Sequence, residues 1–328
     1  MAQVMIVDNV APEAAQVLQQ EGHQVKTVAG RLNTAELIAA CTGCQGLILR
    51  SVTKVTAQFL AAQPELAVVG RAGIGVDNID IETASKRGVL IVNAPTGNTI
   101  AAAEHTLALM LALARHIPQA MGTLQQGRWE RARFQGVEIA GKTLGILGLG
   151  RVGSAVAQRA QALGMRVLAY DPHIDPKKVA DDIVLTSFPA VLGQADFLTL
   201  HLPLTEETQG MISYDALNMM KPGIRLINAA RGALVDEQAL AAALASGQVA
   251  GAALDVLAEE PCTDNPLFGL ENVIITPHLG ASTVEAQAHV AVEVAEQVAA
   301  ALAGERPEHC LNWEQLRRLG ARPTACAM

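Results

Sequence analysis

The sequence predicts an α/β fold made of two doubly wound parallel sheets, with one domain inserted into the other. Its 328 residues suggest two domains, at roughly 150 residues per domain. Short β-like runs alternate with helical patterns almost from end to end, which is typical of parallel α/β layering. A glycine-rich turn at 148–153 also stands between a predicted strand and a predicted helix.

The composition limits the class of protein. Half of the residues are hydrophobic and 17% are charged, which excludes a generally disordered chain. Aromatic residues make up only 3%, so Ala, Val, Leu and Ile must fill the core. The formal net charge of −8 argues against nucleic acid or an anionic membrane as the main partner. No apolar stretch is long enough to predict a membrane span, and no signal peptide is evident after Met1, so we expect a cytoplasmic protein.

The five cysteines are too few and too scattered for a disulfide framework. Cys41 and Cys44 match a C-x-x-C motif, but there is no second pair to complete a zinc site. The motif lies where an Ala-rich helical pattern ends before a strand-like run. This favours two ordinary small apolar residues over a redox or metal-binding pair, and no metal site is expected.

The first section of the chain predicts one small doubly wound unit. Its strands are expected at 4–7, 25–28, 46–49, 67–70 and 90–92, and its helices at 12–21, 34–41 and 55–62. A turn-rich segment at 93–98 then interrupts the series. From Thr99 to about residue 125, an Ala/Leu-rich pattern predicts a long helix that is apolar on most faces, which suits burial against a neighbouring domain or subunit. Residues 127–134 follow as a basic, aromatic connector.

A second α/β series starts at 142–147. Its further strands are expected near 166–170, 183–185, 196–200, 224–228, 250–256 and 272–276. The last helix is expected to begin with a capping box of Ser282 and Glu285 and to run to about Ala303. The residues after it are too few for a third domain, so we expect this helix and the tail to return to the first domain. The predicted domains are 1–98 plus 285–328, and 99–284.

The glycine-rich turn has the pattern of a dinucleotide-binding loop. Gly148 permits a tight turn, Gly150 lets the backbone approach a pyrophosphate, and Gly153 allows close packing of helix on strand. The next strand ends in Asp171, whose carboxylate would accept both hydroxyls of an adenosine ribose and repel a 2′-phosphate. The expected cofactor is therefore NAD rather than NADP, although Arg151, which begins the helix with Val152, could in principle meet that phosphate.

Arg231, Glu260 and His278 follow the carboxyl ends of later strands, where open α/β sheets bind their ligands. Hydride transfer to or from a hydroxy or keto acid needs these three types of group. A cation must orient the substrate carboxylate and polarise its carbonyl, and a group with a pKa near neutrality must transfer the proton. An anion must adjust the pKa of that group.

These residues belong to longer motifs, and on those motifs the chain resembles the D-isomer-specific 2-hydroxyacid dehydrogenase family over nearly its whole length. The motifs are 69–78, 145–151, 228–232 with 235–237, 252–256 with 259–261, and 276–283. Within the family, the branch that oxidises 3-phospho-D-glycerate is indicated by 48–54, 129–131 and 278–283.

The resemblance implies a Rossmann NAD-binding domain inserted into a flavodoxin-like substrate domain. It implies that Arg231 binds the substrate carboxylate and carbonyl, that His278 is the acid/base, and that Glu260 pairs with it. Further cofactor contacts are implied for His201, Leu202, Pro203, Ala229, Ala230, Asp255, His278 and Gly280. Backbone contacts to the substrate are implied for Gly73, Ile74 and Gly75, and phosphate contacts for Arg50, Lys54, Arg71 and Arg131.

The activity implied by the resemblance is NAD-dependent oxidation of 3-phospho-D-glycerate to 3-phosphooxypyruvate, the first step of serine biosynthesis, by a homodimer. Longer members carry C-terminal domains, one of which senses serine, and this chain stops soon after its last helix, so we expect the short, unregulated form. Two alternatives stay open. A glyoxylate or hydroxypyruvate reductase on the same scaffold would give Arg50 and Lys54 little to bind. An NAD-sensing binding protein would not need Arg231, Glu260 and His278.

Overall fold

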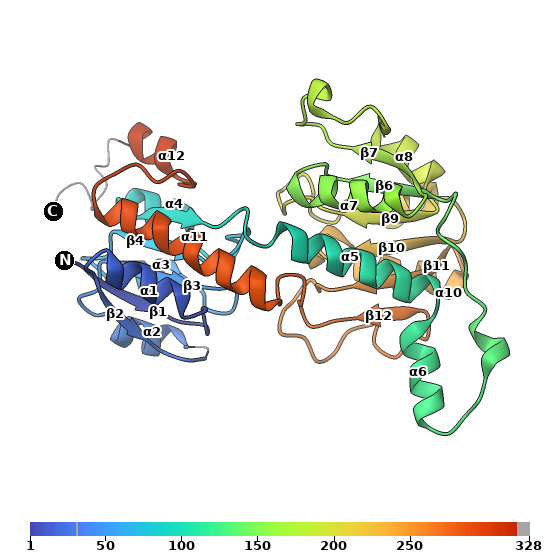
Figure 1. The fold of residues 1–328 in the computed structure, drawn as a ribbon, viewed down its shortest axis with the longest axis horizontal. Helices are drawn as coiled ribbons and strands as arrows, with labels where there is room; N and C mark the ends of the chain where they lie inside the picture. The colour runs from blue at the N-terminus through green and yellow to red at the C-terminus, as the bar shows by residue number, and fades with distance from the viewer. Residues whose placement is uncertain (31, 320–328) are drawn as a thin grey trace. The chain divides into compact units, whose positions relative to one another are not determined.

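The computed structural model describes residues 1–30 and 32–319. These residues form two compact units (Figure 1): unit 1 comprises the described residues up to 98 and those from Ala281 to 319, and unit 2 comprises Thr99–Gly280. The chain passes from unit 1 to unit 2 after residue 98, as predicted. It returns to unit 1 after residue 280, whereas the predicted boundary lies after residue 284. The backbone N–H groups of Leu279 and Gly280 donate to Asp255, which keeps these residues in unit 2.

Unit 1 contains a parallel five-stranded sheet. Its strands are β1 (Gln3–Ile6), β2 (Gln24–Thr27), β3 (Gly46–Leu49), β4 (Val68–Arg71) and β5 (Leu90–Asn93), in the order β2-β1-β3-β4-β5. Its helices are α1 (Glu13–Gln20), α2 (Thr34–Ala40), α3 (Ala57–Ala61), α4 (Ile81–Lys86), α11 (Val284–Leu302) and α12 (Trp313–Arg318). Helices α1 and α11 pack on one face, and α2, α3 and α4 on the other. With both faces covered, the central strands are continuous apolar runs.

Helix α11 completes the core of unit 1, as the sequence predicts. Val294 and Val298 pack so closely on β4 that a Cβ at Gly70 would lie 2.7 Å from the Val298 side chain. The predicted capping box is wrong by one residue. Thr283, whose backbone is extended, is the N-cap, and its Oγ1 accepts a hydrogen bond from Ala286 N at 3.1 Å.

The chain after α11 pairs with the edge strand β5. Leu311 N donates to Ile91 O at 2.8 Å. The Asn312 side chain is 1% exposed; it accepts a hydrogen bond from Ile91 N at 2.9 Å and donates to Val89 O at 2.9 Å. This segment therefore satisfies backbone groups that an open sheet edge would leave unpaired.

Unit 2 contains a parallel seven-stranded sheet. Its strands are β6 (Thr143–Leu147), β7 (Arg166–Tyr170), β8 (Ile183–Leu185), β9 (Phe197–Leu200), β10 (Ile224–Asn228), β11 (Val249–Leu254) and β12 (Val273–Ile275), in the order β12-β11-β10-β9-β6-β7-β8. Helices α5 (Thr99–Ala114) and α7 (Arg151–Ala162) pack on one face. The other face is covered by α8 (Phe188–Gln194), α9 (Tyr214–Met219) and α10 (Glu237–Ser246). Short 3₁₀ helices lie at η1 (Arg131–Phe134), η2 (Pro176–Lys178) and η3 (Gly232–Leu234).

The single helix predicted from Thr99 to about residue 125 is wrong, because the chain breaks between α5 and α6 (Ile117–Gln125). His116 adopts a left-handed conformation with φ 53°. Pro118 has no N–H to donate to the carbonyl of Ala114, which accepts instead from Val137 N at 2.9 Å. Among the described residues, no single helix is long and apolar enough to cross a membrane. In the described part of the chain, α5 and α6 taken together would have the length and composition for a span, but they are bent by 63° at the break.

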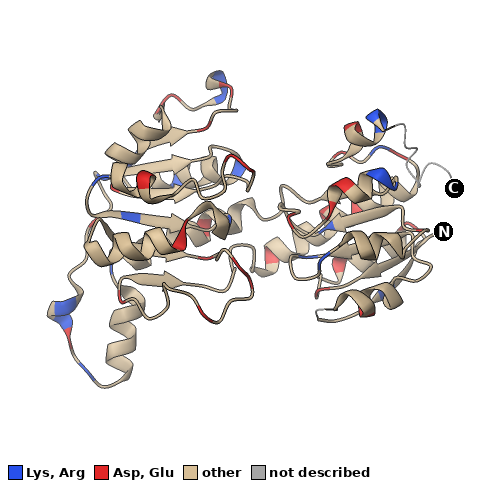
Figure 2. Cartoon of the chain, turned by 180° about the vertical axis from the view of Figure 1, so that it is seen from behind, with Lys and Arg blue, Asp and Glu red and all other residues tan. Residues whose placement is uncertain are grey.

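Figure 2 shows that basic and acidic residues alternate along the described chain of both units. The connector that holds η1 is the basic segment at the lower left of that figure. Two of its three arginines have acidic partners: Arg128 lies 2.7 Å from Glu130, and Arg133 pairs with both Glu130 and Glu271. The connector's positive charge is thus partly neutralised within the chain.

Cys41 and Cys44 lie in the core of unit 1 between the sheet and its helices. Burial raises the pKa of the Cys41 thiol to about 12. A thiol held neutral in this way is a poor nucleophile and a poor metal ligand, as expected of two small core residues.

Candidate active site

The predicted site residues of unit 2, with the exception of Arg131, follow the carboxyl ends of strands. The seven strands are parallel, so their carboxyl ends share one edge of the sheet. Gly148 follows β6 and His201 follows β9, the two neighbouring strands at which the strand order reverses. Open α/β sheets bind ligands at this reversal point.

Two glycines of the dinucleotide loop are required by the protein itself. Gly148 has a φ of 91°, and a Cβ there would lie 2.7 Å from His201 O; a Cβ at Gly153 would lie 2.1 Å from Gly148 O. Gly150 differs, since a Cβ there would meet no protein atom within 4 Å. It is the N-cap of α7, and no side chain caps the helix, whose first turn holds the exposed Arg151 and the half-buried Val152. This helix N-terminus therefore fits the pyrophosphate of a dinucleotide.

Asp171 follows β7 and holds the glycine-rich loop in place. Its Oδ2 accepts a hydrogen bond from Leu149 N and its Oδ1 one from His173 N, both at 2.9 Å. Each carboxylate oxygen can accept a further hydrogen bond, so the side chain still fits the two hydroxyls of a ribose. The bond to Leu149 is a structural role that sequence reasoning did not assign.

The segment 201–203 after β9 offers neutral side chains. His201 Nε2 lies 2.9 Å from Thr199 Oγ1, and desolvation lowers the pKa of His201 to about 4. The imidazole is therefore neutral at pH 7. Leu202 is buried in the core of unit 2, and Pro203 is exposed.

Asn228, at the end of β10, fixes the loop that carries Arg231. Its Nδ2 donates to Arg231 O at 2.8 Å and its Oδ1 accepts from Ala230 N at 3.0 Å, and the side chain is 1% exposed. A Cβ at Gly232 would lie 1.9 Å from the carbonyl carbon of Leu257, so the loops after β10 and β11 touch there. Ala229, Ala230 and Arg231 are half-buried beside this contact. Sequence reasoning missed Asn228, although an Asn at a strand end before a loop is a signal for such a role.

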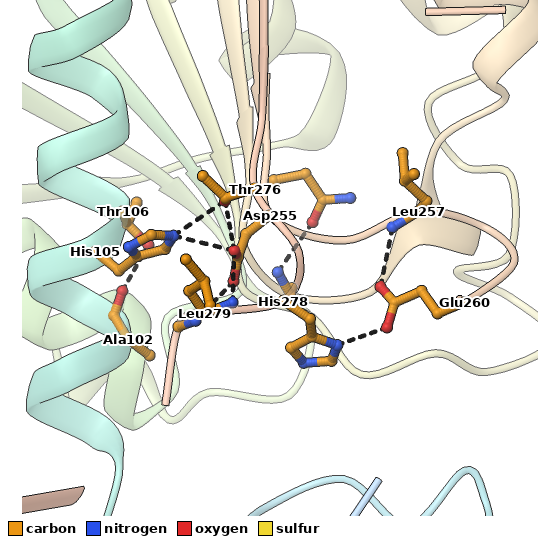
Figure 3. Close-up of polar contacts among 12 residues, drawn as sticks. Ala102, His105, Thr106, Asp255, Leu257, Glu260, Thr276, His278 and Leu279 are labelled. Atoms are coloured by element: carbon orange, nitrogen blue, oxygen red, sulfur yellow. Dashed lines mark hydrogen bonds and ion pairs between the residues drawn. The ribbon is translucent and has the colours of Figure 1, made fainter. Parts of the chain in front are cut away.

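Glu260 and His278 form a direct pair (Figure 3). Glu260 Oε2 lies 2.7 Å from His278 Nδ1, and Glu260 Oε1 accepts from Leu257 N at 3.0 Å. Burial raises the pKa of Glu260, but the hydrogen bond to His278, the charge that His278 can carry, and the Leu257 N–H together lower it below its ordinary value. The carboxylate is thus ionised at neutral pH. With Nδ1 engaged, Nε2 is the ring nitrogen that can exchange a proton with a substrate.

The backbone of His278 is held in an uncommon conformation. Its φ is 58°, in the left-handed region, which costs a residue with a side chain roughly 1–2 kcal/mol. His278 N donates to Asp255 O at 2.8 Å and to Thr276 O at 3.0 Å. The Asp255 carboxylate accepts from Leu279 N and Gly280 N, both at 2.7 Å. Asp255 and Gly280, both predicted cofactor contacts, are therefore engaged in holding the His278 loop.

In unit 1, Arg50 follows the carboxyl end of β3, and its backbone is fixed on both sides. Asp8, which follows β1, accepts from Arg50 N and Thr53 N through Oδ2, each at 3.0 Å. Asn78 Nδ2 donates to Arg50 O at 2.8 Å. Lys54 is exposed in the same loop. Neither Asp8 nor Asn78 was singled out from the sequence.

Arg71 ends β4, at the same edge of this parallel sheet. Its Nη1 donates to Ala72 O at 3.2 Å, and a Cβ at Gly73 would lie 1.7 Å from that nitrogen, so the guanidinium lies over Gly73. Asn93 Nδ2 donates to Ile74 O at 2.7 Å, and this fixes the loop that runs on to Gly75. The structure thus brings the predicted substrate residues of unit 1 to one sheet edge.

Arg131 is not brought together with the other site residues of unit 2. It is exposed on η1, in the connector that enters the amino end of β6. The cofactor loop and His278 lie at the carboxyl end of the sheet. The sequence motif that suggested Arg131 carries no information on which end of the sheet it occupies.

The sequence is 51% identical, over 310 residues or 94% of this chain, to a D-3-phosphoglycerate dehydrogenase of Mycobacterium bovis. The chain spans 58% of that relative's length. Among solved structures, the TT0316 protein of Thermus thermophilus matches with a TM-score of 0.87 and 35% identity, over 94% of this chain and 99% of that one. A glyoxylate reductase of Paecilomyes thermophila matches with a TM-score of 0.85 and 28% identity, over 96% and 99% of the two chains.

Residues 107–280 match the NAD binding domain of the D-isomer specific 2-hydroxyacid dehydrogenases. This match covers more than half of the chain and lies within unit 2, on the sheet that carries the glycine-rich loop and Asp171. The chain belongs to the D-isomer specific 2-hydroxyacid dehydrogenase family, and unit 2 is its NAD-binding domain.

Proposed function

We propose that this chain oxidises 3-phospho-D-glycerate to 3-phosphooxypyruvate with NAD, the first step of serine biosynthesis. The observation that carries the proposal is the Glu260–His278 pair, with Nδ1 and Oε2 2.7 Å apart, at the sheet edge that also carries the dinucleotide loop. The 51% identity to a D-3-phosphoglycerate dehydrogenase supports this substrate.

His278, Glu260 and Arg231 have separate roles in the proposed reaction. His278 Nε2 takes the proton from the C2 hydroxyl, and the Glu260 carboxylate stabilises the imidazolium that forms. The Arg231 guanidinium binds the substrate carboxylate and polarises the developing carbonyl. NAD, when bound, supplies the acceptor for the hydride that leaves C2. Glu260 is held by Leu257 N as well as by His278, so bonds within the chain orient the pair.

We assign the substrate phosphate to Arg50 and Arg71 in unit 1, with Lys54 as a further contact, and the backbone of 73–75 to the substrate carboxylate. Guanidinium groups suit a dianionic phosphate, because they donate several charge-assisted hydrogen bonds in a fixed plane. A glyoxylate reductase is the second candidate, favoured by the likeness to the Paecilomyes thermophila enzyme. Glyoxylate has no phosphate, and the two activities therefore make opposite predictions for Arg50.

Asp171 should make the enzyme prefer NAD to NADP by a factor on the order of 100 or more in kcat/KM. The 2′-phosphate of NADP would meet the partly buried Asp171 carboxylate, and two like charges at contact distance repel by a few kcal/mol. Asp171→Ser keeps a hydrogen-bonding side chain and removes the charge. The ratio of kcat/KM with NAD to kcat/KM with NADP should therefore fall at least about tenfold. Initial rates with both cofactors check this. Equal use of NAD and NADP by the unchanged enzyme would contradict the role of Asp171.

Glu260→Gln should move the pH–rate profiles toward acid. Oxidation needs the neutral imidazole and rises with pH, whereas reduction needs the imidazolium and falls. Replacing the ionised Glu260 by an amide removes the anion that favours the imidazolium, so both midpoints should fall. Both side chains are about one third exposed, so solvent screening keeps this shift small.

The matched control for this measurement is Glu259→Gln, at the exposed carboxylate next in the chain. It should leave both midpoints in place. Unmoved midpoints in Glu260→Gln would show that the pair does not govern the proton transfer.

Arg50→Ala tests the substrate. The loss of one charge-assisted bond to phosphate costs about 1.5–3 kcal/mol, or roughly 10- to 150-fold in kcat/KM with 3-phosphoglycerate. The loss with glyoxylate should be small, so the specificity ratio of phosphoglycerate to glyoxylate should fall at least about tenfold. The backbone of Arg50 is fixed by Asp8 and Asn78, so truncating the side chain leaves the loop in place. Arg87→Ala, at an exposed arginine of unit 1, is the control. An unchanged ratio in Arg50→Ala would favour the reductase.

We propose that the enzyme is a homodimer that uses the apolar face of α6. Ile117, Met121 and Leu124 lie on one side of this helix and are each more than half exposed. Such a face is costly to leave in water, and a second copy can cover it symmetrically. Light scattering should give twice the chain mass of 34.3 kDa, and the double variant Met121→Asp/Leu124→Asp should give a single chain mass. A monomeric unchanged protein would contradict the proposal.

A further inference from the structure

His105, on helix α5, contacts the carboxylate behind the His278 loop, and neither the sequence motifs nor the proposed chemistry uses it. Its Nε2 lies 3.0 Å from Asp255 Oδ1 and 3.3 Å from Thr276 Oγ1 (Figure 3). Its partner is 150 residues away in the chain and is the aspartate that follows β11. Both residues belong to unit 2.

Asp255 is almost fully enclosed and is held by four donors. Besides His105 and the N–H groups of Leu279 and Gly280, it accepts from Thr276 Oγ1 at 2.6 Å, and it is 1% exposed. Burial raises the pKa of Asp255, but the hydrogen bonds from His105, Thr276 and Leu279, with the charge that His105 can carry, bring the net pKa below its ordinary value. The carboxylate is therefore ionised and can only accept, so Nε2 of His105 carries the hydrogen.

The residues that Asp255 holds lie on both sides of His278. Thr276 precedes His278 by two positions, and Leu279 and Gly280 follow it directly. His278 is the strained residue between them, with a φ of 58° and its N–H bonded to Asp255 O. The position of the Asp255 carboxylate thus determines the backbone from which the His278 ring projects toward Glu260.

His105 supplies the one contact to this carboxylate, among those the structure describes, that comes from outside the strand and loop. The other donors are on 276–280, the segment to be positioned, and they move with it. His105 belongs to α5, a helix that is buried against the sheet. Within this helix, Thr106 Oγ1 donates a hydrogen bond to Ala102 O at 2.8 Å (Figure 3). His105 can therefore fix the carboxylate, and through it the loop, relative to the core.

We propose that His105 is a positioning residue: by donating Nε2–H to Asp255, it fixes the loop 276–280 and so holds His278 at its place for proton transfer. The proposal rests on the proposed function, since proton transfer by His278 is what it serves.

The test compares two substitutions at this position. His105→Leu fills similar space without a donor, and kcat should fall about 10- to 100-fold, because a displacement of about 1 Å in a reacting group has an effect of this size. KM and NADH affinity should change by less than about threefold, since His105 is not proposed to touch substrate or cofactor. His105→Gln places an N–H donor at about the distance of Nε2 and should recover most of kcat. His105→Asn is too short to reach Asp255 and should behave like His105→Leu.

A second measurement does not depend on any substrate. Hydrogen exchange of the amides of Leu279 and Gly280 should quicken in His105→Leu and return toward the original rate in His105→Gln. If the exchange responds as expected while neither phosphoglycerate nor glyoxylate is turned over, the proposed function fails, and only the fixing of the loop 276–280 by His105 stands. Glu104→Gln, at an exposed neighbour on α5, should leave kcat within about twofold.

Three results would overturn the proposal. One is kcat within twofold of the original in His105→Leu, and another is equal impairment of His105→Leu and His105→Gln. The third is a loss of activity that tracks a large fall in the thermal midpoint of every variant, which is the outcome for a residue that serves only packing. If His105→Leu does not fold, the comparison of His105→Gln with His105→Asn decides the matter.

Discussion

In each unit, buried Asn and Asp side chains at the carboxyl ends of parallel strands hold the loops that carry the predicted site residues. The four are Asp8, Asn93, Asn228 and Asp255, each no more than 6% exposed. Each bonds the backbone of a loop that carries predicted site residues, around positions 50, 74, 231 and 279 respectively. A buried polar group left without a partner costs about 1–3 kcal/mol, so each loop is confined to the conformation in which these bonds form.

These side chains fix the conformation of the loops, which a parallel sheet alone does not determine. The parallel order brings the strand ends to one edge, but the loops beyond them have no ladder of backbone hydrogen bonds to fix their shape. Hydrogen bonds from the Asn and Asp side chains fix the loops instead. Close backbone contacts, such as that of Gly232 with Leu257, hold neighbouring loops against each other. Arg231 and Glu260 are carried by two loops that touch in this way. The polar groups of the site are thus oriented by hydrogen bonds within the chain.

The sequence identified those features of the fold that depend on local pattern. Strands such as β3 and β10 lie at their predicted residues, because a strand buried on both faces is a continuous apolar run between turns. Features that depend on contacts between residues far apart in the sequence could not be predicted. His105 is one of three consecutive polar residues, 104–106, in a mostly apolar helix, so nothing in the local pattern distinguishes it, and its partner is 150 residues away. The apolar pattern also continues across the break at His116, so the pattern alone could not reveal where the helix ends.

Burial separates two acid–histidine pairs that are otherwise alike in chemistry. His278 and Glu260 are 36% and 37% exposed, whereas His105 and Asp255 are 21% and 1% exposed. A proton can reach the first pair from substrate or solvent, and its charge can change during a reaction at modest cost. The second pair is fixed around an enclosed anion, and a change of its charge would leave a buried donor or acceptor unsatisfied. The same residue types therefore suit opposite tasks, proton exchange in the exposed pair and fixed geometry in the buried one. Asp255 joins the two pairs, because it accepts hydrogen bonds from the Thr276 side chain before His278 and from the backbone of Leu279 after it.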